Sequence, residues 1–441
     1  MIETYSVTPW RRVLGGFLDY LIVLYTILGT HSVYNSTVAG GYHVVPITAI
    51  LMGLYICIFP DMFRKQNFKR FLIFAILWTA YLGIYALVAP SEKLVHLVSK
   101  FIILFFLYIG WFWSHYERKT LTDLFIKYAQ IISIIALISL FFWVTASFLH
   151  WFGSTGTLDI LWGKERTIHS FYGLYFHWQH DFSIHGHQLY RNIGIFTEAP
   201  MYSLHLTTAL MFDIMLNHQR KAFRYFRIAV LLLAIVTTFS ITGYLFAMAL
   251  VVIDIYMILI KNARSEEPEE RKKAVFAIVT ITVLGIILAF VGYLLIADKL
   301  ASRSGGVRKE DYKNGYLGWI DNIFFGAGYG DSEARQRYAS WRWHHRAVDG
   351  YTNSPMAILC EGGIWFFLCF VVPFVYDLIA AWTKREWRLL VCIGLFIFVF
   401  VTTTIQHTSL LIAFMALSFT SMLTGNYQRD KFTFGRPFGT I

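Results

Sequence analysis

Charged residues are scarce in this sequence. Only 15% of its 441 residues are Asp, Glu, Lys or Arg, and 57% are hydrophobic. Soluble domains carry about a quarter charged residues, so this composition excludes an ordinary soluble domain. Lipid is therefore expected to surround most of the chain, and we expect a single all-α integral membrane domain over residues 1–441.

Several chemical motifs are also missing. The four cysteines all lie within apolar runs, so neither a disulfide nor a CxxC metal site is expected. No DxD sequence occurs, which disfavours a nucleotide-sugar mechanism with a bound metal. The stretch GAGYG at 326–330 is neither a dinucleotide fingerprint nor a P-loop, because no strand is expected before it and no GK[ST] follows. We expect no metal and no cofactor.

Long apolar runs are abundant and predict about twelve transmembrane helices, each of roughly 20 residues. The expected spans are 13–33, 44–60, 71–90, 95–114, 128–149, 196–217, 228–243, 244–260, 274–297, 355–381, 389–404 and 408–424. The run 228–260 has 33 residues, which is too long for one span, so a break is expected in FSITGY near Gly243.

The basic residues predict the orientation. Of the 38 Lys and Arg, 24 fall in short segments on the side of the N-terminus, while Lys93 and Lys100 are the two in short segments on the other side. The other 12 lie in two long loops, 150–195 and 298–354. The positive-inside rule then predicts cytoplasmic termini and two long outer loops. The net charge of +11 sits in short clusters rather than on one basic face, so no nucleic-acid partner is expected.

The second long outer loop is rich in arginines and aromatic residues. Its arginines are Arg303, Arg308, Arg335, Arg337, Arg342 and Arg346. Its ten aromatic residues include Tyr312, Trp319, Tyr329, Trp341 and Trp343. Arginine suits bidentate binding of phosphate oxygens, and aromatic faces suit sugar rings. The loop therefore favours a substrate with a phosphate end and a hydroxylated body, although lipid headgroup binding and an interfacial aromatic belt would use the same residues.

The first long outer loop is rich in histidines. They are His150, His169, His177, His180, His185 and His187. The last four could in principle ligate a metal, but no cysteine or pair of carboxylates completes a site. We expect surface histidines with mixed hydrogen bonds.

Two acidic residues stand at the mouths of expected spans. In RNIGIFTEAPMY, Glu198 needs a partner or a wet cavity, and Arg191 or a loop arginine could pair with it. The same segment could instead be a helix start, with Thr197 as cap and Pro200 in the first turn. In TNSPMAILCEGGIW, Glu361 lies inside an apolar run and is expected to face the bundle interior.

The motifs together resemble a known family. The pieces are RNIGIFTEAP, FSITGYL, Arg308 with Tyr312, GAGYG, and TNSPMAILCEGGI, in this order over residues 190–365. In these pieces the chain resembles the O-antigen polymerase and O-antigen ligase superfamily.

The resemblance implies a GT-C-type membrane glycosyltransferase of the bacterial cytoplasmic membrane. Such an enzyme takes a glycan from polyprenyl pyrophosphate on the outer face and transfers it, with inversion, to a sugar hydroxyl of another lipid-linked repeat unit. A ligase with a different acceptor is the nearest alternative, and a flippase for lipid-linked oligosaccharides is another. The implied partners are the lipid-linked donor and acceptor, membrane lipids, and flippase and chain-length regulator proteins.

The resemblance also assigns residues. Arg191 and Arg308 are expected to hold the pyrophosphate, with Arg303 close by. Tyr312, Arg346 and Asn353 complete the expected substrate-binding set.

The identity of the general base is less constrained. Family members usually have His-Asn at the start of the tenth span, and here Asn353 and Gly363 keep the family spacing while Thr352 replaces the histidine. The candidates for the base are therefore Glu198, His344 and His345.

Overall fold

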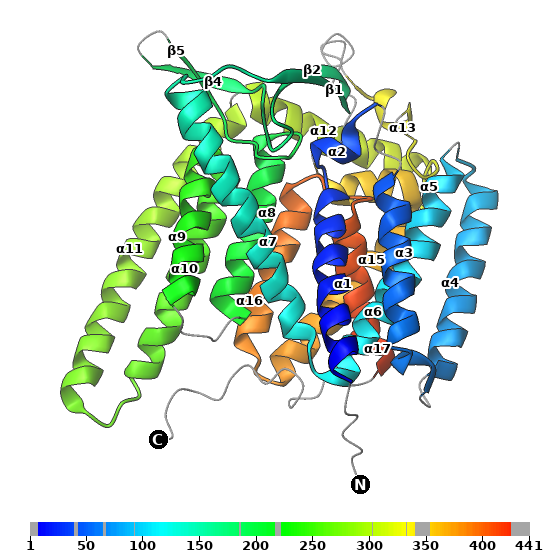
Figure 1. Cartoon of the computed structure of the whole chain (residues 1–441), viewed down its shortest axis with the longest axis horizontal. Coiled ribbons are helices and arrows are strands. Elements are labelled where there is room, and N and C mark those ends of the chain that lie inside the picture. Colours follow the sequence, from blue (N-terminus) through cyan, green and yellow to red (C-terminus); the bar gives the residue numbers. More distant parts are fainter. Residues whose placement is uncertain are drawn as a thin grey trace.

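A computed structural model describes residues 8–38, 43–64, 68–91, 93–184, 187–216, 222–301, 303–331, 333–339 and 353–424. The fold is a bundle of helices with a few short strands across one end (Figure 1). We call that end of the bundle the strand end. The mainly helical architecture expected from the sequence is confirmed.

The described residues up to Phe142 form seven α-helices. They are α1 Pro9–Leu28, α2 Val33–Ser36, α3 Val44–Ile58, α4 Phe68–Val88, α5 Leu94–Val98, α6 Phe105–Arg118 and α7 Leu121–Phe142. Short π-helical segments join or extend them, η3 Ser99–Leu104 before α6 and η4 Trp143–Phe148 after α7.

The second half supplies the rest of the described helices. They are α8 Ala199–Met211, η5 Phe212–Leu216, α9 Ala222–Thr237, α10 Ile241–Asn262, α11 Pro268–Ala301, α12 Arg303–Asp321, α13 Glu333–Gln336, α15 Ser354–Thr383, α16 Trp387–Thr402 and α17 Ser409–Thr424.

Among the residues that the structure describes, five helical stretches are long and apolar enough to cross a membrane. They are Phe68–Val88, Leu94–Arg118, Leu121–Phe148, Ile241–Ile260 and Ser354–Thr383, and three shorter apolar helices accompany them. The chain is thus a multi-pass membrane protein, while the number of twelve spans stays a prediction.

The expected break in the run 228–260 is confirmed, but it lies upstream of Gly243. Helix α9 ends at Thr237 and α10 begins at Ile241, and Phe239 between them has a left-handed φ of 50°. Gly243 lies inside α10, where it lets this helix approach α8. A Cβ at Gly243 would stand 1.9 Å from Ser203 Oγ, so the glycine is required for packing rather than for the turn.

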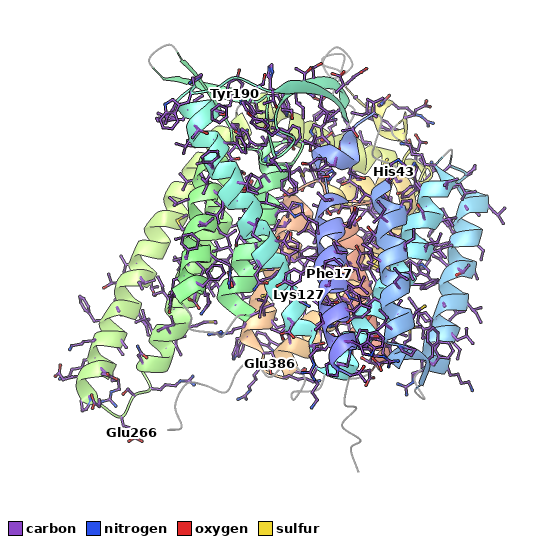
Figure 2. All side chains as sticks on the ribbon, viewed as in Figure 1. Phe17, His43, Lys127, Tyr190, Glu266 and Glu386 are labelled. Carbon is purple, nitrogen blue, oxygen red and sulfur yellow. The ribbon has the colours of Figure 1, made fainter. Side chains whose placement is uncertain are left out.

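The first and last described helices bring both ends of the chain to one face. Ser409 N donates to Gly29 O at 3.4 Å, so the start of α17 meets the end of α1 and the two helices run in opposite directions. Pro9 and Thr424 therefore lie opposite the strand end. Figure 2 shows the same polarity, with Tyr190 at the strand end and Glu266 and Glu386 at the other. The cytoplasmic location of that face stays a prediction.

The first long loop corrects the all-α expectation, because it folds into strands. They are β1 Gly156–Trp162, β2 Lys164–Phe171, β3 Tyr175–His177, β4 His180–Ile184 and β5 His187–Tyr190. The first three form an antiparallel sheet and the last two a hairpin. Gly163, with φ of 70°, makes the turn between Trp162 and Lys164, and the side chains of Ile160 on β1 and Ile168 on β2 are buried.

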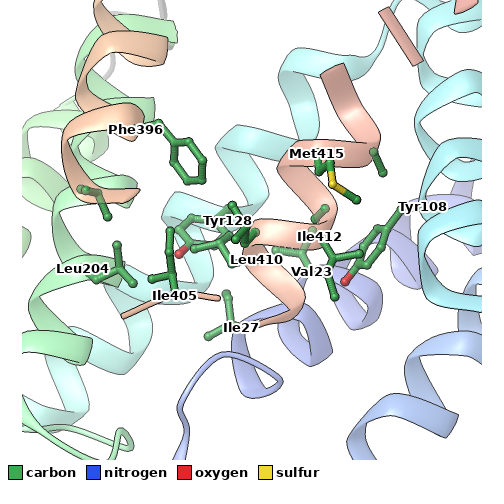
Figure 3. Close-up of a cluster of buried hydrophobic side chains, with 14 of the residues drawn as sticks. Val23, Ile27, Tyr108, Tyr128, Leu204, Phe396, Ile405, Leu410, Ile412 and Met415 are labelled. Carbon is green, nitrogen blue, oxygen red and sulfur yellow. The ribbon is translucent and has the colours of Figure 1, made fainter. Parts of the chain in front are cut away.

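The bundle core is apolar and brings distant helices together. Figure 3 shows Val23 and Ile27 of α1, Tyr108 of α6, and Leu410 of α17 in one cluster, all of them buried. This core fixes the strand-end termini of α1, α8 and α17 relative to one another, and it is around these termini that the polar residues gather.

Candidate functional site

A cavity of about 380 Å³ opens at the strand end of the bundle. Its walls come from the end of α1, from β1 and β2, from α8, α10 and α12, and from the segment between α16 and α17. Residues far apart in the sequence therefore converge on one polar space.

Glu198 lines this cavity from the position just before α8. Its backbone is extended, with φ of −157° and ψ of 162°, and its side chain makes no capping hydrogen bond. The expectation that Thr197 caps this helix is therefore wrong, since the cap position is one residue later. The Trp162 indole instead lies close enough to the Glu198 carboxylate to favour its ionised form. Pro200 stands in the first turn of α8, as expected.

The charge state of Glu198 reflects two opposing effects. Burial raises its pKa, while the Trp162 indole and the charges of Arg191, Arg308 and Arg166 lower it, and the net pKa lies above the usual carboxyl value. These arginines come from both long loops, Arg191 and Arg166 from the first and Arg308 from the second, while an ion pair of Glu198 with one of them stays a prediction.

Arg308 reaches the cavity from α12. It makes no hydrogen bond to another described residue, so its guanidinium donors are available to a ligand. Tyr312 lies one turn further along the same helix, and its hydroxyl donates to Val401 O at 2.7 Å at the end of α16. Tyr312 is not among the described residues that line the cavity, and its bond positions α12 and hence Arg308.

Arg191 lies beside the turn between α9 and α10. Its Nε donates to Thr238 O at 2.9 Å and its Nη2 to Phe239 O at 3.2 Å, so its guanidinium holds the turn between α9 and α10. It acts on Glu198 through its charge. Substrate contact by Arg191 stays a prediction, as does that by Arg303, the first residue of α12, whose side chain is not described.

Asn353 begins α15. Its Oδ1 accepts the Met356 N–H at 3.0 Å and the residue is 1% exposed, so it is a helix cap. The next residue, Ser354, donates through Oγ to Thr403 O at 2.7 Å and accepts from Ile405 N at 2.8 Å. The start of α15 thereby holds the segment between α16 and α17 that forms one cavity wall. The predicted site residues His344, His345 and Arg346, with Thr352, lie outside the described residues.

Sequence reasoning missed Arg166, although it lies in the arginine-containing first loop. Its guanidinium lies over the Trp178 ring, with 4.6 Å from Cζ to the ring centroid, and its Nε donates to Trp162 O at 3.1 Å. The Trp178 indole in turn donates to Thr197 O at 2.8 Å. The two Nη atoms of Arg166 have no hydrogen-bond partner among the described residues. The alternation of Leu158, Ile160 and Trp162 in GTLDILW was the available signal of a strand, whereas KERTIHSF, which contains Arg166, has no such alternation.

His31, which follows α1, was missed as well. Its Nε2 lies 2.8 Å from Thr404 O, and its ring meets the Trp162 ring edge-on at 4.8 Å between centroids. Its backbone has a left-handed φ of 55° and its carbonyl accepts the Thr197 N–H at 3.0 Å. Burial lowers the pKa of His31 to about 4, so the ring is neutral at physiological pH.

The expectation that Glu361 faces the interior is confirmed, because the residue is 4% exposed. Its Oε2 lies 2.6 Å from His407 Nε2 and accepts the Gly330 N–H at 2.8 Å. Gly328 N also donates to Glu361 O at 2.9 Å. The GAGYG turn therefore rests directly on α15 beside the cavity.

The histidines of the first loop are only partly described. The expectation that these histidines lie on the surface is wrong for His177, which is buried. Its Nδ1 forms a hydrogen bond of 3.0 Å with Ser147 Oγ, and its ring stacks on the Tyr190 ring with 3.9 Å between centroids. The side chains of His180 and His187 are not described, and His185 lies outside the described residues.

Comparison with known proteins gives one match. Residues 226–371, from α9 into α15, match the family model described as O-antigen ligase. This segment contains Arg308, the GAGYG turn and the start of α15, while Glu198 precedes it. No curated protein matches the chain. Over these residues, about a third of the chain, the sequence is similar to the O-antigen ligase family, and this match supports the resemblance to the O-antigen polymerase and ligase superfamily.

Proposed function

We propose that this protein polymerises a bacterial surface polysaccharide. It transfers a glycan from polyprenyl pyrophosphate to a sugar hydroxyl of another lipid-linked repeat unit, with inversion, at the outer face of the cytoplasmic membrane. The observation that carries the proposal is the cavity itself, which is lined by Arg166, Arg308, the Glu198 carboxylate and two indoles. The Nη atoms of Arg166 and the guanidinium of Arg308 have no hydrogen-bond partner among the described residues.

The residues suit the chemistry of this transfer. The anomeric C–O bond to phosphate breaks, and the electron pair leaves on the pyrophosphate, where guanidinium groups stabilise the charge. Trp162 and Trp178 offer flat apolar faces for sugar rings. Glu198 is the described member of the predicted set of bases, with His344 and His345 as the others. The sequence match to a glycan-transferring family is independent of this geometry.

The test is a reaction with purified protein. The protein in nanodiscs is incubated with a polyprenyl pyrophosphate-linked repeat unit, without nucleotide or metal, and products are resolved on a gel. A ladder of longer glycans is expected from the wild type, and Arg308→Ala should abolish it. Lys309→Ala is the matched control, because Lys309 is the next residue of the same helix and is exposed. Absence of a ladder from folded protein that binds the repeat unit would refute the polymerase proposal.

Ligation is a second candidate, favoured by the description of the matching family model. A ligase uses the same donor and the same arginines but a different acceptor. Adding a lipid A core acceptor to the same reaction separates the two: a single transfer to that acceptor without a ladder would indicate a ligase.

A further inference from the structure

We propose that His31 is the residue that takes the proton from the attacking sugar hydroxyl, through its Nδ1 atom. This inference rests on the proposed glycan transfer. It assigns the base to a residue that lies outside both long loops and outside the segment matched by the family model.

The hydrogen bond of His31 defines its tautomer. Its Nε2 lies 2.8 Å from Thr404 O, and a carbonyl oxygen can only accept, so Nε2 carries the hydrogen. In the neutral ring Nδ1 then carries the lone pair. No described residue hydrogen-bonds to this nitrogen, and His31 lines the cavity. The ring is therefore a fixed proton acceptor beside the space where a substrate would bind.

The surroundings of Glu198 and His31 differ in a way that matters for the reaction. The cations that act on Glu198 are Arg191, Arg308 and Arg166, whereas the cation that acts on His31 is Lys100. Trp162 is a neighbour of both residues, because its indole interacts with Glu198 and its ring meets the His31 ring edge-on. The arginine side of the cavity suits the pyrophosphate, so we place the leaving group beside Glu198 and the acceptor hydroxyl beside His31.

An inverting displacement needs the base and the leaving group to lie on opposite sides of the anomeric carbon. The acceptor oxygen forms its bond to the anomeric carbon on the face opposite the departing phosphate oxygen. The proton of the acceptor hydroxyl passes to His31 Nδ1, the anomeric C–O bond breaks, and its electron pair leaves on the pyrophosphate. The imidazolium then returns its proton to water. No metal or further reactant enters this balance.

The charged and titratable groups around His31 support a neutral ring. They are Lys100 from η3, His205 from α8 and, as the other neighbour of Trp162, Glu198. Lys100 and burial both oppose protonation of the free ring. Negative charge on a bound pyrophosphate would favour the transient imidazolium only when substrate is present.

The test compares His31→Gln and His31→Asn with the wild type. Glutamine keeps a donor for Thr404 O, and asparagine tolerates the left-handed backbone at this position, so at least one variant should fold. His96→Gln is the control, because His96 is exposed on α5 and does not line the cavity. The measurements are donor affinity, from quenching by a labelled polyprenyl pyrophosphate glycan, and the single-turnover rate of transfer.

The expected result is a loss of about 10²-fold or more in the rate of transfer with donor affinity unchanged. His31→Ala should regain part of the rate when imidazole is added at a pH where imidazole is neutral. A folded His31→Gln variant with the wild-type rate would overturn the inference. So would a rate loss that parallels a loss of donor affinity and resists imidazole, because that pattern indicates a structural role. Wild-type protein that forms no glycosidic product would instead refute the proposed function.

Discussion

The Nε2 atom of His407 lies 2.6 Å from Oε2 of Glu361, next to the GAGYG turn, where Glu361 is buried and His407 is part-buried. His407 has a left-handed φ of 63°, and its carbonyl accepts a hydrogen bond from Lys100 Nζ at 2.8 Å. The pair thus joins α15, η3 and the segment before α17. The segment before α17 also contributes Gln406 to the cavity wall. The Glu361–His407 pair therefore supports the cavity wall, although neither residue is among those that line the cavity.

Glu361→Ala should destabilise the protein strongly. The change leaves the His407 ring and the Gly330 N–H without their acceptor in a buried place, at a cost of roughly 2–4 kcal/mol. Thermal unfolding in detergent measures the effect. Glu333→Ala, which removes an exposed carboxylate from α13, is the control and should unfold like the wild type. Equal melting temperatures for both variants would show that the buried pair is not structural.

Gly363 and Gly394 provide a matched pair of glycines in apolar helices. Gly363 has φ of 64° and ψ of −170°, and a Cβ there would stand 2.5 Å from Phe324 C, whereas nothing lies within 4 Å of a Cβ at Gly394. Gly363→Ala should therefore unfold at a lower temperature by strain of at least about 1–3 kcal/mol plus the clash. Gly394→Ala should be neutral or slightly stabilising. A harmless Gly363→Ala would contradict the kink in α15.

Arg191 and Arg166 should respond differently to removal of the guanidinium. Arg191→Ala deletes the hydrogen bonds to Thr238 and Phe239, so we expect a loss of about 2–3 kcal/mol in stability. Arg166→Ala deletes one hydrogen bond, to Trp162 O, and the stack on Trp178, so it should lower stability by less than Arg191→Ala. It should weaken donor binding by about tenfold, because its Nη atoms have no hydrogen-bond partner among the described residues and Arg166 lines the cavity. Unfolding curves and donor titrations on both variants separate these roles. Arg166→Ala with unchanged donor affinity would remove Arg166 from the phosphate site.

The sequence predicted the parts of the site that depend on local chemistry. An intramembrane carboxylate must be paired, which is why the burial of Glu361 and the arginine environment of Glu198 could be expected. The break before α10 followed from the length of one apolar run. The strands of the first loop were missed because histidines and arginines interrupt the alternation that marks a strand.

The remaining residues depend on contacts that no local pattern reveals. His31 and Thr404 are 373 residues apart in the chain, and neither belongs to a motif. The fold also assigns different tasks to residues of one motif, since Arg191 holds a turn while Glu198 faces the cavity. The spacing of these residues in the sequence does not predict their different tasks, because the tasks depend on how α8 packs against the turn between α9 and α10.

Glu198→Gln should make the protein more stable and less active. Burial raises the pKa of Glu198 in the folded state, so the stability that protonation provides is fully present below the unfolded pKa and is lost as the pH rises through the folded pKa. Glutamine does not titrate, so the variant does not lose this stability as the pH rises. The variant should therefore unfold at a higher temperature than the wild type at neutral pH, and the difference should vanish in acid.

The activity of the same variant should move in the opposite direction. Without the carboxylate among Arg166 and Arg308, we expect kcat/KM for the donor to fall by about 10- to 150-fold, because a charge-assisted contact of this kind contributes roughly 1.5–3 kcal/mol. Glu165→Gln, an exposed change on β2, should alter neither property. A Glu198→Gln protein that melts earlier than the wild type at neutral pH would mean that the ionised carboxylate stabilises the fold, and the raised pKa would then be wrong in sign.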